Sequence, residues 1–248
     1  MKILLTIAYD GTNYFGWQIQ DNFITVQGEV EAGLKRLFSK AIEIRGASRT
    51  DSGVHALGQR AVFTIDTTIP MENLPYAINN NLPRDIRVTK AVVVEESFHP
   101  QYLAKNKTYR YKILNMPHMN PLLNNYAWHV PRTLDIEKMK EASKFVIGEH
   151  DFDAFCASGA TTKTSIRTVY DLQVKTGEDS IVYIEINGNG FLYNMVRIIA
   201  GTLVYIGYGK LQVSDMEKII ASKNRTLAGI TAPPQGLTLM EINYENCI

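Results

Sequence analysis

The residues with the clearest chemical potential lie at positions 46–56, which read GASRTDSGVHA. The carboxylate of Asp51 stands between the cation of Arg49 and the imidazole of His55. Glycine and serine around them favour a tight turn, and apolar patterns at 41–44 and 61–65 predict flanking strands. We therefore expect a loop between two strands, a common place for a catalytic carboxylate. The alternative is an Asx-type turn, in which Asp51 hydrogen-bonds its own backbone.

A second stretch, residues 102–114, reads YLAKNKTYRYKIL and predicts a strand. Strand alternation divides its side chains between two faces, one of which holds Lys105, Lys107, Tyr109 and Tyr111. Cations meet phosphates and tyrosine rings stack on unpaired bases, so this mixture suits RNA. A solvated strand with amphipathic tyrosines explains the same pattern equally well.

The third stretch, residues 191–207, reads FLYNMVRIIAGTLVYIG and predicts a largely buried helix. Its one charge is Arg197, and a buried arginine needs a partner because losing its water costs several kcal/mol. A snorkelling side chain or a structural ion pair satisfies that need as well as a catalytic site does.

These strings, taken together, resemble one protein family. RTDSGVHA is similar to the RTDxGVHA motif of the TruA family of tRNA pseudouridine synthases, and GFLYNMVR is similar to that family's third motif. AYDGTNYFGWQIQ and TVQGEVEAGL resemble its amino-terminal signature, and RTLAGITAPPQGLTL resembles its closing segment. The resemblance extends over essentially the whole chain.

The resemblance implies a role for each candidate side chain. Asp51 would be the catalytic residue, and Arg197 would pair with it and keep it ionised. Tyr109 is chosen over Tyr111 because the family's essential tyrosine precedes an Arg-Tyr pair. Tyr109 would stack on the uracil and could remove the C5 proton.

The resemblance also implies the reaction, an isomerisation of uridine to pseudouridine at positions 38, 39 and 40 of the tRNA anticodon stem-loop. The target base must leave the stack to reach Asp51, so base flipping is expected, and Arg49 and His55 could hold the displaced backbone. Whether Asp51 attacks the sugar or the base stays open. The family implies no cofactor, a homodimer and, with no membrane segment in the sequence, a cytoplasmic enzyme.

Two other classes of function compete with this one. A non-catalytic tRNA-binding protein on the same scaffold would not need Asp51 and Arg197 together. A carboxylate-based glycosidase or phosphoesterase would need a second acid or a metal cluster near the motif, and the sequence provides neither.

Composition limits the possible partners. The formal net charge of the 248 residues is +1, so RNA binding must depend on local clusters of basic residues. The candidates for such a cluster are Lys105, Lys107, Arg110, Lys163 and Arg167. The five histidines have no paired ligand spacing, so no metal site is predicted. Cys156 and Cys247 are far apart in the sequence and are expected to be reduced thiols.

The resemblance implies an α+β fold with mixed, mainly antiparallel sheets flanked by helices. We expect helices after an N-cap at Thr25 and after a capping box at Ser214 and Glu217. Strands are expected at 2–9, 60–66, 87–94, 124–130, 166–175, 180–187 and 237–244. The resemblance implies two similar-sized domains with an active-site cleft between them. The first, 1–103, would carry the Asp51 loop, and the second, 104–248, would carry Tyr109 and Arg197.

Overall fold

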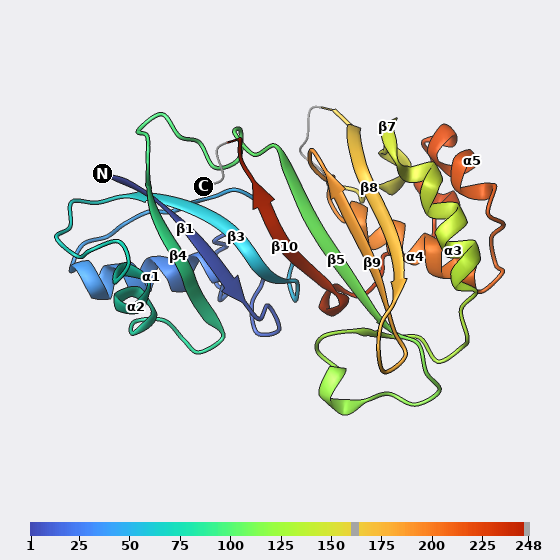
Figure 1. The fold of residues 1–248 in the computed structure, drawn as a ribbon, viewed down its shortest axis with the longest axis horizontal. Helices are drawn as coiled ribbons and strands as arrows, with labels where there is room; N and C mark the ends of the chain where they lie inside the picture. Colours follow the sequence, from blue (N-terminus) through green and yellow to red (C-terminus); the bar gives the residue numbers. More distant parts are fainter. Residues whose placement is uncertain (160–163, 246–248) are drawn as a thin grey trace. The chain divides into compact units, whose positions relative to one another are not determined.

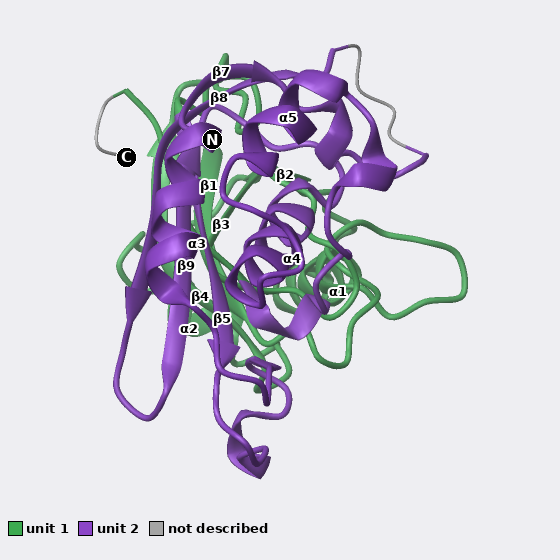
Figure 2. Cartoon of the chain, turned by 90° about the vertical axis from the view of Figure 1, so that its right-hand side faces the viewer, with its two compact units in different colours: residues 1–105, 238–248 green, residues 106–237 purple. Residues whose placement is uncertain are grey.

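The computed structural model describes residues 1–159 and 164–245, and it groups them into two compact units. Unit 1 contains residues 1–105 together with the end of the chain from residue 238 onward, and unit 2 contains residues 106–237 (Figure 2). Lys163 and Cys247 lie outside the described residues. Within the described residues no helix combines the length and apolarity that crossing a bilayer requires.

Unit 1 is built on a sheet with the strand order β4-β1-β3-β10, in which β2 also pairs with β3 (Figure 1). Strand β1 is antiparallel to both β3 and β4, whereas β10 runs parallel to β3. Its elements are β1 Lys2–Tyr9, α1 Val26–Phe38, β2 Arg45–Gly46, β3 His55–Thr64, α2 Leu74–Asn79, β4 Ile86–Val94 and β10 Leu237–Asn243.

Helix α1 begins where the sequence predicts. The Thr25 side chain accepts a hydrogen bond from the Gly28 amide, as an N-cap should. Val26, Val30 and Leu34 form its buried stripe, so the apolar face of the helix is fixed on the core.

Within unit 2 the strands follow the order β5-β9-β8-β7, each antiparallel to its neighbour, and β6 pairs in parallel with β5. The strands are β5 Asn106–Leu114, β6 Trp128–His129, β7 Gly148–Asp151, β8 Ile166–Thr176 and β9 Ile181–Gly188. The helices are α3 Ile136–Ser143, α4 Met195–Gly207 and α5 Asp215–Ser222, with short 3-10 turns η1 to η5 at 121–123, 144–146, 153–155, 225–227 and 234–236. Helices α3 and α4 pack on each other, α3 also contacting β8 and α4 contacting β5. The predicted α+β class with mixed, mainly antiparallel sheet is confirmed.

The last strand differs from its expected place in the second domain. Thr238 pairs with His55 and Leu239 with Ala56, which makes β10 part of the unit 1 sheet. A Cβ on Gly58 would lie 2.8 Å from the Cα of Glu241, so the two strands approach where β3 carries no side chain. The pairing joins distant parts of the chain, and the strand pattern of 237–244 does not identify its partner.

Candidate active site

The loop that carries Asp51 lies between β2 and β3, as predicted. The Val54 amide donates to the carbonyl of Asp51 at 3.1 Å, which closes a four-residue turn. Gly53 in this turn has a φ of +76°, a conformation that glycine adopts without strain. Asp51 is half-buried, and the turn fixes the shape of the backbone that carries it.

The amino-terminal segment holds this loop on both sides of Asp51. The Trp17 amide donates to the Thr50 carbonyl at 3.1 Å, and the Gly53 amide donates to the Tyr14 carbonyl at 3.3 Å. The hydroxyls of Tyr9 and Thr50 form a buried hydrogen bond of 2.7 Å. These contacts give the amino-terminal signature a physical role, because they set the position of the loop through its main chain.

Two glycines of that segment leave room for the loop backbone. A Cβ on Gly11 would overlap the carbonyl oxygen of Val54, and a Cβ on Gly16 would overlap that of Thr50. Gly16 also has a φ of +81°. Any side chain at either position would therefore push the Asp51 loop away.

We predict that Gly16→Ala destabilises the protein by roughly 2–5 kcal/mol, since a positive φ costs about 1–2 and overpacking about 1–3. Gly209→Ala is the matched control, because Gly209 has a φ of +73° but no atom within 4 Å of its would-be Cβ. Denaturant unfolding of both variants checks this. Equal losses of stability would show that backbone strain alone acts and that the loop contact contributes nothing.

Arg49 is exposed on the loop, two residues before Asp51. Within residues 1–159 and 164–245, its guanidinium has no hydrogen-bond or ion-pair partner. The side chain is therefore available to an anion in solution, which agrees with the expected contact to an RNA backbone.

His55 occupies a different environment from the one expected of a residue that binds substrate. Its side chain is 8% exposed, and its Nδ1 lies 3.0 Å from the Gly11 amide and 3.1 Å from Asp10 Oδ1. The buried ring therefore connects the start of β3 to Asp10 and Gly11 of the amino-terminal segment, which helps to position the loop.

Tyr109 lies on β5 opposite Ile186 of β9, and it is 6% exposed. Its ring meets the ring of Phe191 edge-on, with centroids 5.2 Å apart. Phe191 precedes α4, so this contact connects the tyrosine to the segment that leads to Arg197. Tyr111, two residues further along the strand, is fully buried and donates through its hydroxyl to the Pro233 carbonyl at 2.7 Å.

Arg197 lies in the first turn of α4 and is half-buried. Its Nε donates to the Ala232 carbonyl at 2.7 Å, and one terminal nitrogen donates to Asn194 Oδ1 at 2.6 Å. The Ala232 amide in turn donates to the Arg197 carbonyl at 3.1 Å. Both of these acceptor oxygens are neutral. Asn194 holds the guanidinium from a left-handed conformation with a φ of 60°, which asparagine tolerates.

The segment at 229–236 fixes the part of α4 that carries Arg197, a role that we did not predict from the sequence. A Cβ on Gly201 would overlap the Ile230 carbonyl oxygen, and one on Gly229 would lie 2.6 Å from Thr202. The Thr202 hydroxyl accepts from the Gly229 amide at 2.9 Å and donates to the Ile198 carbonyl at 2.8 Å. The sequence feature that could have indicated this role is the string GITAPPQG, because its glycines and prolines are typical of a constrained backbone.

The predicted basic cluster is only partly available to a ligand. Lys105 forms an ion pair with Glu245, and Arg110 pairs with Glu185, both at 2.6 Å. Desolvation, and secondarily the nearby charge of Arg167, lower the pKa of Lys107 to about 8.

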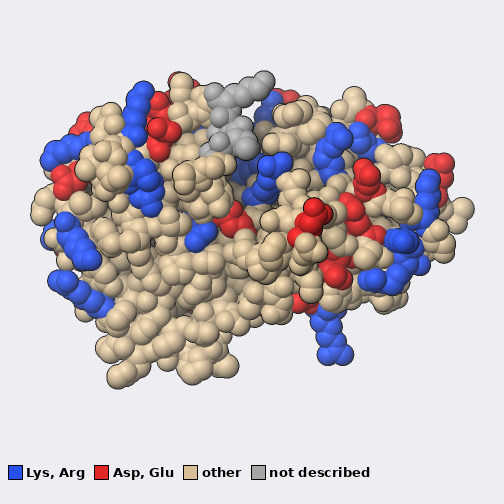
Figure 3. Space-filling view, turned by 180° about the vertical axis from the view of Figure 1, so that it is seen from behind, with Lys and Arg blue, Asp and Glu red and all other residues tan. Residues whose placement is uncertain are grey.

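Charges of both signs are mixed on one face of the molecule. Figure 3 shows lysine and arginine side chains in several groups, with acidic side chains among them on the right of that view.

The described residues include no group of three or more His, Cys, Asp or Glu side chains that could hold a metal ion.

The five predicted site residues thus fall into two sets. Unit 1 brings Arg49, Asp51 and His55 into one loop region, and unit 2 places Tyr109 on β5 and Arg197 on the adjoining helix α4. In each set the backbone around the side chain is fixed by hydrogen bonds and by glycines that allow close approach.

Comparison with known proteins assigns the family. The family model described as tRNA pseudouridine synthase matches residues 5–103 and 142–245. Proteins named tRNA pseudouridine synthase A from Thermoanaerobacter pseudethanolicus and Ruminiclostridium cellulolyticum are 52% and 50% identical over 243 residues, covering 98% of this chain and 99% of theirs. The protein of that name from Bacillus pumilus is 45% identical over 248 residues, covering 99% of this chain and all of its own. This chain therefore belongs to the tRNA pseudouridine synthase family, and over almost its whole length it is similar to proteins named tRNA pseudouridine synthase A.

Proposed function

We propose that this protein is an isomerase that converts uridine to pseudouridine in tRNA, at positions 38, 39 and 40 of the anticodon stem-loop. The observation that carries the proposal is Asp51, which lies in the string RTDSGVHA on a loop fixed by main-chain hydrogen bonds to the amino-terminal segment. Family membership and relatives at 45–52% identity over 98–99% of the chain support the assignment to tRNA.

The proposed reaction rearranges one nucleotide without net gain or loss of atoms. The ionised Asp51 acts on a flipped-out uridine, either as a nucleophile or as a base. The bond between N1 and C1′ breaks, the uracil turns, and a bond between C5 and C1′ forms. The C5 proton is lost to a base and N1 acquires a proton, so no oxidant, reductant or cofactor is consumed.

We assign the other side chains to binding and charge balance. Arg197 is the proposed charge partner of Asp51 and keeps the carboxylate ionised. Tyr109 stacks on the flipped uracil and could take the C5 proton, and Arg49 binds the displaced phosphate backbone. Because His55 is buried against Asp10 and Gly11, we give it the role of positioning the loop.

The resemblance of the motifs extends the proposal to the assembly and its location. We propose that the protein acts as a homodimer in the cytoplasm, with the anticodon stem-loop as its RNA partner.

The proposed function predicts that the pure protein releases tritium from C5-labelled uridine in unmodified tRNA, and that release survives exhaustive treatment with EDTA. The prediction follows because the proposed steps use only protein groups. A tRNA folded beforehand and exchanged into a monovalent salt controls for the effect of magnesium on RNA structure. Turnover that stops with EDTA and returns only with zinc would contradict a cofactor-free reaction.

A further inference from the structure

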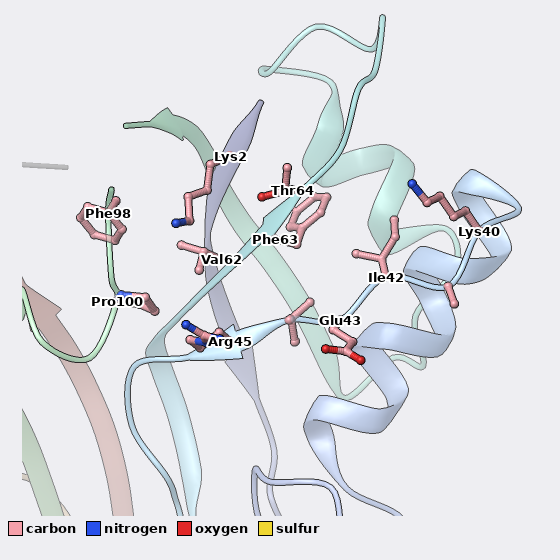
Figure 4. Close-up of a pocket in the computed structure, with 12 residues that line it drawn as sticks. Lys2, Lys40, Ile42, Glu43, Arg45, Val62, Phe63, Thr64, Phe98 and Pro100 are labelled. Carbon is pink, nitrogen blue, oxygen red and sulfur yellow. The ribbon is translucent and has the colours of Figure 1, made fainter. Parts of the chain in front are cut away.

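A groove on unit 1 is separate from the Asp51 loop and has no role in the proposed reaction. It has a volume of about 380 Å³ and runs along the short strand β2 and the neighbouring part of β3 (Figure 4). Its walls include the side chains of Ile42, Val62, Phe63 and Phe98, which are largely buried and give it an apolar floor.

Three cations line this groove, Lys2, Lys40 and Arg45, against the single carboxylate of Glu43. Arg45 and Lys40 are exposed, and none of the three has an ion-pair partner within the part of the chain that the structure describes. The Lys2 ammonium donates to the main-chain carbonyl of Glu96 at 2.6 Å, which fixes the direction of that side chain. The groove therefore has an excess of positive charge that the described residues do not neutralise.

An aromatic stack lies beside these cations. The rings of His99 and Tyr102 are 4.1 Å apart and inclined by 19°, and Tyr102 is 79% exposed. His99 stands between two residues that line the groove, Phe98 and Pro100. Its Nδ1 accepts from the amides of Gln101 and Tyr102, at 3.3 and 3.2 Å, so its ring orientation is fixed.

The charges that line the groove act on the His99 ring of the aromatic stack. Desolvation lowers the pKa of His99, and the charges of Arg45 and Lys2 lower it further. The imidazole is therefore within the field of both cations. A phosphate between them and a base on the exposed Tyr102 ring would satisfy the charge and the aromatic surface together.

We propose that this groove and the Tyr102 ring bind an unpaired nucleotide of RNA, with its phosphate against Lys2 and Arg45 and its base on Tyr102. The proposal rests on the proposed function, since the RNA would be the tRNA substrate, held at a nucleotide other than the target uridine. Phosphate contacts supply affinity that depends on salt, and base stacking on an aromatic ring adds affinity without reading sequence.

The first test removes the charges. Lys2→Gln, Lys40→Gln and Arg45→Gln are combined, and the matched control combines Lys138→Gln, Lys140→Gln and Lys144→Gln, which lowers the net charge equally on the α3–η2 segment. Binding of unmodified tRNA is measured over a series of salt concentrations. The groove variant should bind roughly tenfold more weakly, and its plot of log affinity against log salt should be less steep by about two.

The second test separates stacking from charge. Tyr102→Ala should weaken binding of tRNA about tenfold, whereas Tyr102→Phe, which keeps the ring, should bind like the wild type. Competition with polyuridylate and with polyaspartate identifies the ligand class. Polyuridylate should displace tRNA from the Tyr102→Phe variant more effectively than from Tyr102→Ala, and polyaspartate should not distinguish the two.

The possible outcomes distinguish failure of the groove proposal from failure of the proposed reaction. If the wild type forms pseudouridine in tRNA but the groove variant has the affinity and salt slope of the control, the groove proposal is wrong. Equal competition by polyaspartate and polyuridylate against both Tyr102 variants would also overturn it, by showing a general anion groove. If the wild type forms no pseudouridine yet the groove and Tyr102 variants lose RNA affinity as expected, the proposed reaction fails and the groove stands. Thermal melting of each variant verifies that it is folded.

Discussion

Asp51→Asn is expected to abolish the release of tritium from C5-labelled uridine in tRNA, by roughly 10⁴-fold or more, while the protein stays folded and binds tRNA. The amide keeps the size of the side chain but removes the negative charge and the nucleophilic oxygen. The fold should tolerate the change because main-chain hydrogen bonds of Thr50 and Gly53 hold the loop on either side of Asp51.

The matched control for this prediction is Asp66→Asn, which makes the same chemical change at a fully exposed carboxylate. That variant should retain wild-type turnover. Melting curves and tRNA affinities for both variants separate a lost reaction from a lost fold. Release by the Asp51 variant at close to the wild-type rate would remove Asp51 from the mechanism.

The second large effect is the energetic coupling of Arg197 to Asp51, if the two pair as proposed. Arg197→Met should destabilise the protein, because it leaves the Asp51 carboxylate without its proposed cation. It also removes the donor to the Ala232 carbonyl and to the side-chain oxygen of Asn194. Breaking a fully buried ion pair costs roughly 3–5 kcal/mol, and we expect less here because Arg197 is half-buried. The variant should also lose most of its activity.

A double-mutant cycle measures that coupling. Adding Asp51→Asn to the Arg197→Met protein should recover part of the lost stability, because the isolated charge is gone, while activity stays absent. We expect a coupling of about 0.5–3 kcal/mol from denaturant unfolding of the four proteins. A parallel cycle of Arg197→Met with Asp66→Asn should be additive. Additivity in the Asp51 cycle as well would mean that the two side chains do not touch.

The local features of the site could be predicted from the sequence, because short-range chemistry determines them. The turn at Asp51 follows from the glycine and serine around it, and Thr25 caps α1 as its residue type indicates. The apolar run before Gly207 forms α4, although the helix begins at Met195 and not at 191, since Asn194 adopts a left-handed conformation.

Some local predictions were wrong. Ser214 makes no side-chain cap, because its backbone is helical and the Asp215 carboxylate instead accepts from the Gln212 amide. The strand expected at 124–130 is reduced to Trp128 and His129 of β6.

The features that could not be predicted depend on contacts between distant residues. The pairing of β10 with β3 and the hydrogen bonds between Arg197 and Ala232 join segments whose patterns do not specify a partner. His55 has the same residue type whether it faces substrate or the interior, and its burial next to Gly11 becomes visible only in the folded chain.

The most direct test of the proposed function is to map pseudouridine at nucleotide resolution in unmodified tRNA after incubation with the wild-type protein and, separately, with Asp51→Asn. We predict pseudouridine at positions 38, 39 and 40 wherever a uridine occurs there, none when those uridines are replaced by cytidine, and none with the variant. Pseudouridine elsewhere in the tRNA would contradict the assigned positions, and an unmodified tRNA after incubation with the wild type would contradict the proposed function itself.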